Sequence, residues 1–220
     1  MSVLNKLACA VGRRDEVPNQ ELARALAQKP DAAAVKELVE NLHNKNKDIR
    51  HDCIKTLYEL GQADPKQIAP YYKEFLALLD NKNNRMQWGA MTALSSLAHQ
   101  KPQELLASIG KIIDVANKGS VITRDHCVKI LVAIASDKKQ LDKIFPLLRE
   151  QLLLCPTNQL PSYAEQALPL INEKHKAVFI KTLSERLGEI EKDSKRKRVE
   201  KVIGKLKKQA AYSRPSSLKK

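Results

Sequence analysis

Two tripeptides combine residue types that can bind a metal ion or form a nucleophile–base pair. They are His-Asp-Cys at 51–53 and Asp-His-Cys at 125–127. Imidazole and thiolate are common zinc ligands, and a cysteine beside a histidine can act as an activated nucleophile. The helical register of the surrounding residues argues against both uses, because it places the cysteines in a buried column and the histidines on outward columns. No further ligand set converges on either tripeptide, so we predict core cysteines, surface histidines and no metal or other cofactor.

The cysteine pattern bears on the redox environment. The four cysteines are Cys9, Cys53, Cys127 and Cys155, and none forms a Cys-x-x-Cys pair. This spacing excludes zinc ribbons and thioredoxin-like redox motifs. We expect reduced thiols and a cytoplasmic protein, or a nuclear one if the source is eukaryotic. Lys6 interrupts any signal-peptide core, and no apolar run approaches the about 18 residues of a membrane span, so we expect no membrane contact.

The composition favours a helical protein. Of 220 residues, 43% are hydrophobic and 29% charged, which excludes disordered and membrane-spanning chains. Seven glycines and few aromatics (one Trp, five Tyr, three Phe) argue against β-sandwiches and barrels. The sequence contains no Gly-x-Ser-x-Gly, His-Glu-x-x-His, Walker or Rossmann pattern, so we predict that the protein is not an enzyme.

A repeat with a period of 37 residues organises most of the chain. Shifted by this period, the sequence aligns with itself without gaps over four units. One small and two apolar columns are spaced at i, i+4 and i+7, which predicts the buried stripe of a helix. These columns are Cys53/Ala90/Cys127/Ala164, Leu57/Leu94/Leu131/Leu168 and Leu60/Leu97/Ile134/Ile171.

Each unit is predicted to hold two helices, A and B, joined by a polar turn. The expected A helices are 33–42, 71–79, 109–116 and 145–154, and the expected B helices are 48–60, 85–98, 123–135 and 161–171. Asp48 is the expected N-cap of the first B helix, and Pro169 should kink or shorten the last one. Further helices are expected at 19–28, 178–190 and 199–206.

The segment 35–42, followed by Asp48 and Arg50 and by small and leucine residues at fixed steps, resembles a HEAT repeat. The resemblance covers about residues 33–171 and rests on packing residues, so it is informative about fold rather than function. It implies an all-α protein, a right-handed α-α superhelix (HEAT/armadillo-like solenoid) of about four to five two-helix repeats. We expect a single domain over 1–209, with an N-terminal cap at about 1–30, repeats at about 31–182 and basic C-terminal capping helices at about 183–209. A flexible tail is expected at 210–220.

In solenoids of this family the B helices line the concave surface, so the resemblance implies that a partner binds there. The outward columns of these helices are mixed in residue type, as on a surface that faces solvent. Trp88, the only tryptophan, lies in an otherwise polar column and is either a binding hot spot or a core residue tucked into the neighbouring repeat. The candidate partner-binding residues are His51, Lys55, Arg85, Trp88, Arg124, Asp125, Lys129 and Tyr163.

Positive charge concentrates near the C-terminal end. Of a net charge of +14, residues 192–220 contribute +10 (12 Lys/Arg against 2 Asp/Glu), which leaves +4 for residues 1–191. Three interpretations remain open: a solvated face of a capping helix, a contact with nucleic acid or an acidic partner, and an import-like cluster in a eukaryote. Only Tyr212 interleaves with the charges, which argues against base stacking. The candidate basic residues are Lys195, Arg196, Lys197, Arg198, Lys201, Lys205, Lys207 and Lys208.

The predicted function is a non-catalytic HEAT-repeat interaction scaffold that binds a protein partner on the concave B-helix surface. The first alternative is nucleic-acid binding through the basic C-terminal helix. The second, suggested by the resemblance, is a HEAT-like alkyl-base DNA glycosylase, which needs a catalytic Asp beside an aromatic-lined basic cleft. Trp88 and Asp125 share one column, but the second tryptophan expected of such a cleft is absent, so we expect no glycosylase activity.

Overall fold

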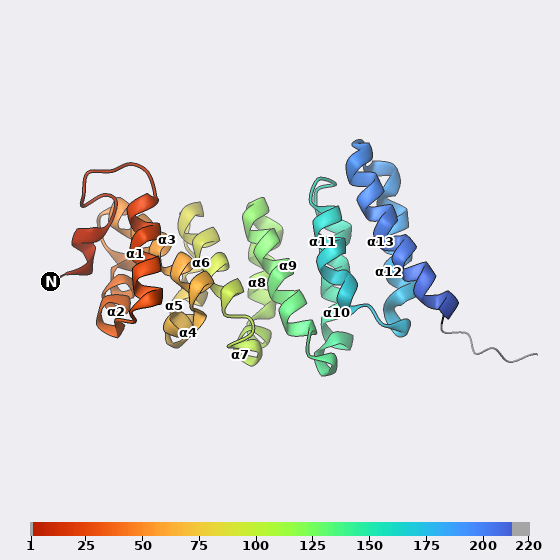
Figure 1. Cartoon of the computed structure of the whole chain (residues 1–220), viewed down its shortest axis with the longest axis horizontal. Helices are drawn as coiled ribbons and strands as arrows, with labels where there is room; N and C mark the ends of the chain where they lie inside the picture. Colours follow the sequence, from red (N-terminus) through yellow and green to blue (C-terminus); the bar gives the residue numbers. More distant parts are fainter. Residues whose placement is uncertain (1, 213–220) are drawn as a thin grey trace, which may run out of the picture. The chain divides into compact units, whose positions relative to one another are not determined.

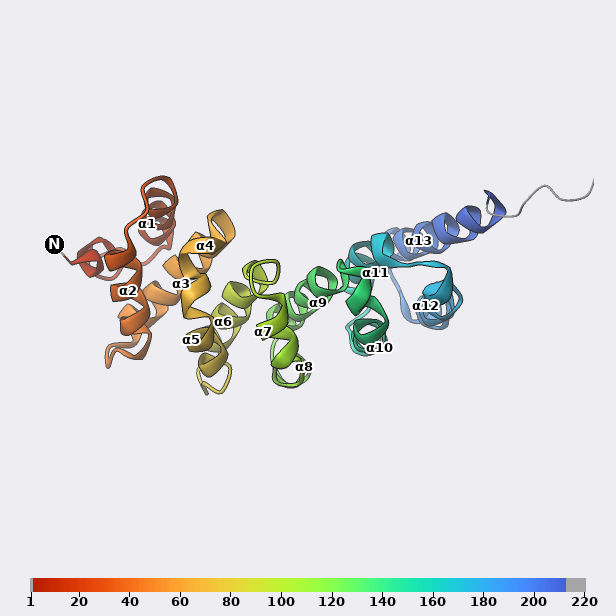
Figure 2. The ribbon, with the colours of Figure 1, turned by 90° about the horizontal axis from the view of Figure 1, so that it is seen from below.

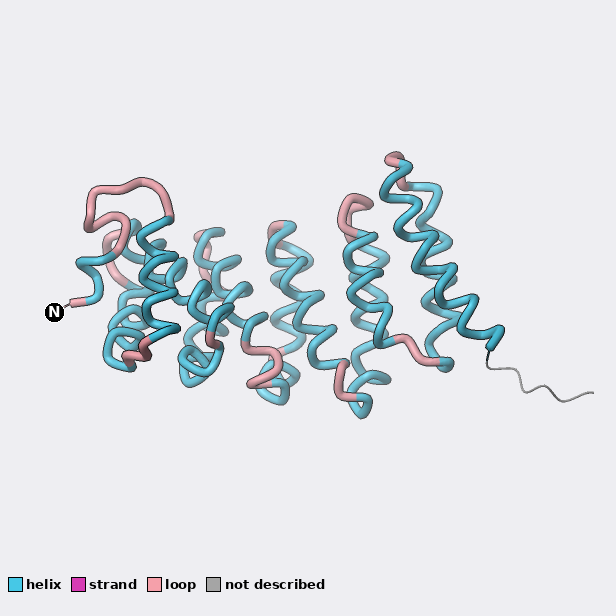
Figure 3. Tube along the Cα trace, viewed as in Figure 1, coloured by secondary structure: helices cyan, strands magenta, loops and turns pink. Residues whose placement is uncertain are grey.

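The structure of the protein is a computed structural model that describes residues 2–212 and, among these, the side chains of residues 2–208. These residues form α-helices and short 3-10 helices joined by loops, and include no strand (Figure 3). The all-α prediction is confirmed. Contacts divide the chain into two compact units, Met1–Ala133 (the first unit) and Ile134–Lys220 (the second unit).

The first unit contains an N-terminal cap followed by A/B helix pairs (Figure 1). Helix α1 packs against α3, and α3 packs against α6, so these helices form one continuous layer of B helices. Figure 2 shows α5 and α8 in the other layer, below α6 and α9. The elements are η1 (Val3–Lys6), α1 (Val17–Gln28), α2 (Ala32–Glu40), η2 (Asn41–His43), α3 (Lys47–Ala63), α4 (Pro65–Ile68), η3 (Ala69–Tyr71), α5 (Tyr72–Leu78), α6 (Asn84–Ser96), α7 (Pro102–Ala107), α8 (Ile109–Lys118) and α9 (Val121–Ala135), whose last residues fall in the second unit.

The second unit has the same two-layer arrangement. Helix α10 packs against α12, and α11 packs against α13 (Figure 2). Its elements are α10 (Lys138–Leu154), α11 (Leu160–Ala167), η4 (Leu168–Leu170), α12 (Glu173–Arg186), η5 (Leu187–Glu189) and α13 (Asp193–Tyr212). Helix α13 is longer than the expected last helix, 199–206, and it continues past residue 209, where the capping region was expected to end. The rest of the predicted flexible tail, 213–220, lies outside the described residues.

The predicted core columns are buried in the first three repeats. Every member there, from Cys53 to Ile134, is at most 1% exposed. In the fourth repeat the small residue Ala164 is buried, but Leu168 and Ile171 are only half-buried. The prediction is wrong for these two residues because α11 ends at Ala167, two residues before Pro169, and they leave its buried stripe.

Asparagines begin the B helices of the first two repeats. The side chain of Asn46 accepts a hydrogen bond from the backbone N–H of Asp48 at 2.9 Å. The side chain of Asn83, one period later, accepts from the N–H groups of Arg85 (2.9 Å) and Met86 (3.3 Å). The prediction of Asp48 as N-cap is therefore wrong by two residues, because the asparagine side chain satisfies the free N–H groups of the first turn.

Gly89 marks a close approach between α3 and α6. A Cβ atom at this position would lie 2.6 Å from Cγ1 of Ile54, which is fully buried in α3. Carbon atoms are comfortable at about 3.5–4.0 Å, so only glycine fits this packing without a shift. Because α3 and α6 approach each other closely, a side chain from each helix can contact the same carboxylate, that of Glu16.

Candidate functional site

The candidate site is built around a carboxylate shared by three successive B helices of the first unit. Glu16, at the start of α1, lies 2.8 Å from Nζ of Lys55 in α3 and 2.6 Å from Nη2 of Arg85 in α6. Lys55 also donates a hydrogen bond to Glu59 at 2.7 Å. We call these four residues the Glu16 bridge. It joins helices that are far apart in sequence through one side chain of the N-terminal segment.

The charges of the Glu16 bridge balance. The side chain of Lys55 is only 6% exposed, and this burial alone would lower the pKa of its ammonium group. Hydrogen bonds to Glu16 and Glu59 outweigh that effect and hold the pKa of Lys55 above its ordinary value. Lys55 therefore stays charged, and the bridge is a neutral set of two cations and two anions.

Two aromatic rings, the buried Tyr58 and the half-buried Trp88, lie next to the bridge. Nζ of Lys55 lies 4.9 Å from the centre of the Tyr58 ring, within the range of a cation–π contact. The Tyr58 and Trp88 rings are tilted by 53° with their centres 5.6 Å apart. The sequence left open whether Trp88 is a binding residue or a core residue. Trp88 is half-buried: one part packs on the preceding repeat, and another part faces outward.

The irregular N-terminal segment 8–16 is attached to α3 by a second polar network. Asp52, 9% exposed, accepts hydrogen bonds from the backbone N–H of Cys9 and from Nδ2 of Asn19, both at 2.8 Å. The side-chain oxygen of Asn19 in turn accepts from the N–H of Ala8 at 3.0 Å. Side chains of the B helices thus hold this segment through both its backbone and the carboxylate of Glu16.

The two histidines of the tripeptides are within hydrogen-bonding distance of neighbouring polar side chains, and the pKa of each lies below its ordinary value. Nε2 of His51 lies 3.2 Å from Nδ2 of Asn83, and burial and the nearby Arg85 lower the His51 pKa. Nδ1 of His126 lies 2.7 Å from Oγ of Ser95, and burial lowers the His126 pKa to about 4.

The cysteines of the tripeptides are core residues, as predicted. Cys53 and Cys127 are fully buried, and burial raises the pKa of Cys53 to about 12. Burial and hydrogen bonding to Asp52 raise the pKa of Cys9 to about 11. Cys9 and Cys53 are therefore protonated thiols rather than the thiolates that bind metals or attack substrates. Across the part of the chain that the structure describes, no group of three or more His, Cys, Asp and Glu residues is placed to hold a metal ion.

Two predicted partner-binding residues do not face outward. Tyr163 is 1% exposed and Lys55 is 5% exposed. Tyr163 shares the repeat register of Asp52, Gly89 and His126. In the first unit that register faces the preceding B helix rather than solvent. Lys55 is covered by its own ion pairs, so both outward assignments are wrong.

Arg124 lies near the start of α9, in the repeat register of side chains that bond to the preceding turn. It lies one period after Gln87 and two periods after Arg50. Arg50 donates to the carbonyl of Asn44 at 2.5 Å, and Gln87 donates to the carbonyl of Leu79 at 3.0 Å, so both side chains brace the end of helix A. Nη1 of Arg124 is buried without a hydrogen-bond partner. We therefore remove Arg124 from the candidate surface.

The remaining candidates share the outward columns of α3, α6 and α9. Lys129 is exposed, and His51, Arg85, Trp88 and Asp125 are half-buried. Ile122, in register with Arg85, is 41% exposed and adds an apolar side chain. We call these six residues the B-helix face. Sequence reasoning missed Glu16 because it precedes the first repeat and has no counterpart one period later.

The predicted basic residues divide into two groups in the second unit. Lys195 and Arg196 are half-buried and bond to the carbonyls of Asn158 (2.9 Å) and Ile190 (2.7 Å). The others are exposed on α13, where Arg198 pairs with Glu165 through two hydrogen bonds of 2.8 and 2.5 Å. The exposed set is Lys197, Arg198, Lys201, Lys205, Lys207 and Lys208.

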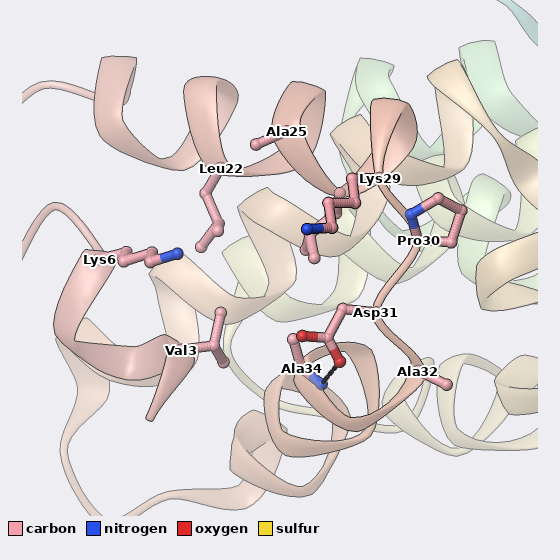
Figure 4. A pocket seen from close by; sticks show the side chains of 10 residues that line it. Val3, Lys6, Leu22, Ala25, Lys29, Pro30, Asp31, Ala32 and Ala34 are labelled. Atoms are coloured by element: carbon pink, nitrogen blue, oxygen red, sulfur yellow. Dashed lines mark hydrogen bonds between the residues drawn. The ribbon is translucent and has the colours of Figure 1, made fainter. Parts of the chain in front are cut away.

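Two cavities lie near the N-terminus, and neither is lined by Trp88, Asp125 or Lys129. One of about 570 Å³ lies between η1, α1 and α2, with Val3 and Leu22 beside two lysines (Figure 4). Asp31 in its wall caps α2 by accepting from the N–H of Ala34 at 3.0 Å (Figure 4). A second, of about 440 Å³, lies between segment 8–16 and the starts of α3 and α6.

Within the described residues, none of the helices combines the length and the apolar character needed to cross a bilayer.

Comparison with known proteins identifies the fold. No family model and no curated protein matches the chain. An engineered protein solved by a structural genomics consortium is 22% identical with a TM-score of 0.61, over 94% of this chain and 100% of that one. A designed armadillo repeat protein in complex with the peptide (KR)4 is 18% identical with a TM-score of 0.63, over 93% and 100%. This chain has a HEAT/armadillo-like repeat fold. Another designed armadillo repeat protein, 15% identical over 92% and 99% with a TM-score of 0.60, agrees.

Proposed function

We propose that this protein is a non-catalytic HEAT-repeat scaffold that binds a protein segment on the B-helix face of its first unit. One observation carries the proposal: the B helices already hold an irregular segment, residues 8–16, of the chain itself. Asp52 accepts from a backbone N–H, while Lys55 and Arg85 bind a carboxylate. A partner's backbone and acidic side chains would be recognised by the same kinds of contact.

Trp88 supplies the apolar anchor of this face. Its ring is braced by Tyr58 and is therefore held in place before a partner arrives, which reduces the entropy lost on binding. The other positions of the B-helix face include the charged residues Arg85, Asp125 and Lys129, and Ile122 adds exposed apolar area. A partly desolvated tryptophan inside a polar rim is the usual composition of a binding hot spot. A designed repeat protein of similar fold was solved with a bound peptide, which supports this type of use.

The test compares captured partners across matched variants of the full chain. Affinity purification from the native source, read by quantitative mass spectrometry, uses wild type, Trp88→Ala/Arg85→Ala and the exposed single variant Lys129→Glu. The control is Lys73→Glu, an exposed lysine of the A-layer helix α5. Partners should be lost with both face variants and kept with the control, while thermal unfolding confirms that each variant folds. Partners kept at wild-type levels by both face variants would contradict the proposal.

The non-catalytic part of the proposal has its own test. Trp88 rests against Tyr58, and neither it nor Asp125 lines the two cavities near the N-terminus. A base-excision assay on alkylated DNA should therefore show no product for wild type or Asp125→Asn. Product that forms with wild type and disappears with Asp125→Asn would show that the protein is an enzyme.

A further inference from the structure

Helix α13 carries a line of cations on the side away from its core. Its apolar side chains Val199, Val202, Ile203 and Leu206 are buried, so they fix which face points outward. Arg198, Lys201, Lys205 and Lys208 are exposed and follow the spacing i, i+3, i+7 and i+10. Residues at this spacing lie along one side of a helix. We call these four residues the α13 stripe.

The dimensions of the α13 stripe suit an extended polyanion. Its two ends, Arg198 and Lys208, are ten residues apart, which corresponds to about 15 Å at about 1.5 Å per residue. Duplex DNA carries about one negative charge per 1.7 Å of its axis, so several phosphates face a surface of this length. Among the ion pairs of the described residues, only Arg198 of the stripe is engaged, with Glu165. The three lysines are therefore positioned to meet phosphates.

The chemistry of this face favours nucleic acid over a membrane or an acidic protein. A helix that lies on a bilayer needs an apolar face to insert, but the large apolar side chains that the structure describes on α13, Val199, Val202, Ile203 and Leu206, are buried in its own unit. Protein interfaces are enriched in Trp, Tyr and Arg and depleted in Lys, whereas three of the four positions of the stripe are lysines. Phosphate contacts need only regularly placed positive charge, and they position a protein without reading bases.

We propose that the α13 stripe binds the phosphate backbone of nucleic acid without sequence preference. This site lies in the second unit and goes beyond the protein-binding function proposed for the B-helix face. Glu165 limits the strength of binding, because its carboxylate occupies the guanidinium of Arg198. Glu165→Gln removes this negative charge and should strengthen binding.

Fluorescence anisotropy with a labelled duplex DNA tests the proposal on the full chain. Wild type should bind with an affinity that falls steeply with salt. Lys201→Glu/Lys205→Glu/Lys208→Glu should lose at least about tenfold in affinity and reduce the slope of log K against log salt by about 3, at about 0.9 per phosphate contact. The matched control is Lys138→Glu/Lys139→Glu/Lys143→Glu, which changes net charge equally on exposed positions of α10 and should change both values little.

Several outcomes would overturn the assignment. Equal losses in the two triple variants would show a general charge effect with no specific site. Binding that is insensitive to salt, or absent in wild type, would remove the site altogether. If duplex DNA does not bind but poly-glutamate binds through the stripe, the stripe belongs to an acidic protein. If vesicles of phosphatidylcholine with phosphatidylserine bind through it instead, it belongs to a membrane. Stronger DNA binding by Glu165→Gln, together with a selective loss in the stripe variant, is the expected result.

Discussion

Replacing Gly89 by alanine should destabilise the protein, although the same change in a helix is normally favourable. An alanine in place of glycine usually raises the free energy of unfolding by about 0.4–1 kcal/mol. At position 89, however, the new Cβ would lie 2.6 Å from Cγ1 and 3.5 Å from Cγ2 of Ile54. The first distance is about 1 Å shorter than a comfortable carbon–carbon contact of about 3.5–4.0 Å.

Ile54 cannot move aside cheaply, because it is β-branched and fully buried in α3. Overpacking of this kind costs about 1–3 kcal/mol, so the net loss of unfolding free energy for Gly89→Ala should be about 1–2 kcal/mol. Urea unfolding monitored by circular dichroism measures it. Gly110→Ala in α8 is the matched control in the same unit, since nothing lies within 4 Å of its new Cβ. It should stabilise the protein by about 0.4–1 kcal/mol.

A double-mutant cycle separates overpacking from other causes. In an Ile54→Ala background the space occupied by Cγ1 is empty, so Gly89→Ala should become neutral or stabilising. The reasoning would be refuted if Gly89→Ala stabilised the otherwise unchanged protein as Gly110→Ala does. It would also fail if the cost of Gly89→Ala were the same in both backgrounds.

Three further predictions follow from the polar groups of the first unit. Glu16→Gln should lower the free energy of unfolding in urea by about 1–2 kcal/mol, because it leaves the buried Lys55 with one fewer anion. The control Asp15→Asn, at an exposed ion pair with Arg13, should change it much less. Equal effects of the two substitutions would argue against the Glu16 bridge. Burial lowers the pKa of His126 to about 4 in the folded chain, from an ordinary value of 6.5. Between pH 6.5 and pH 4 the unfolded chain therefore binds more protons at His126 than the folded chain does. The free energy of unfolding should fall as the pH drops through this range. His126→Gln should flatten this dependence in urea titrations at several pH values, and an unchanged slope would exclude His126 as its source. Cys53 should resist iodoacetamide at neutral pH until the protein unfolds, as followed by mass spectrometry, and rapid labelling of the folded chain would contradict its burial and raised pKa.

The repeat explains why the fold was predictable. A period of 37 residues fixed which positions of each B helix are equivalent, and burial of Cys53, Leu57 and Leu60 follows directly from their spacing. The period also relates Arg124 to Arg50, two periods earlier, whose side chain bonds to the carbonyl of Asn44 in the preceding turn rather than facing a partner.

The candidate site was less predictable because its central contacts do not repeat. Glu16 lies in the N-terminal cap and crosses α3 to reach Arg85, a contact between residues 69 apart. Burial of Lys55 depends on that carboxylate, so no helical register could show it. The outward assignment of Tyr163 is wrong for a related reason. Its column faces the preceding B helix, and residue spacing alone does not show which of the non-core columns faces a neighbouring helix and which faces solvent.

The central claim is that a protein segment binds on the B-helix face of the first unit. Site-specific photo-crosslinking measures this contact directly, with a photoreactive amino acid at Lys129 on the face or at Lys73 on α5, both exposed. We expect a crosslinked partner peptide from position 129 and none from position 73. Crosslinks to the same partner from position 73 but not from position 129 would contradict it.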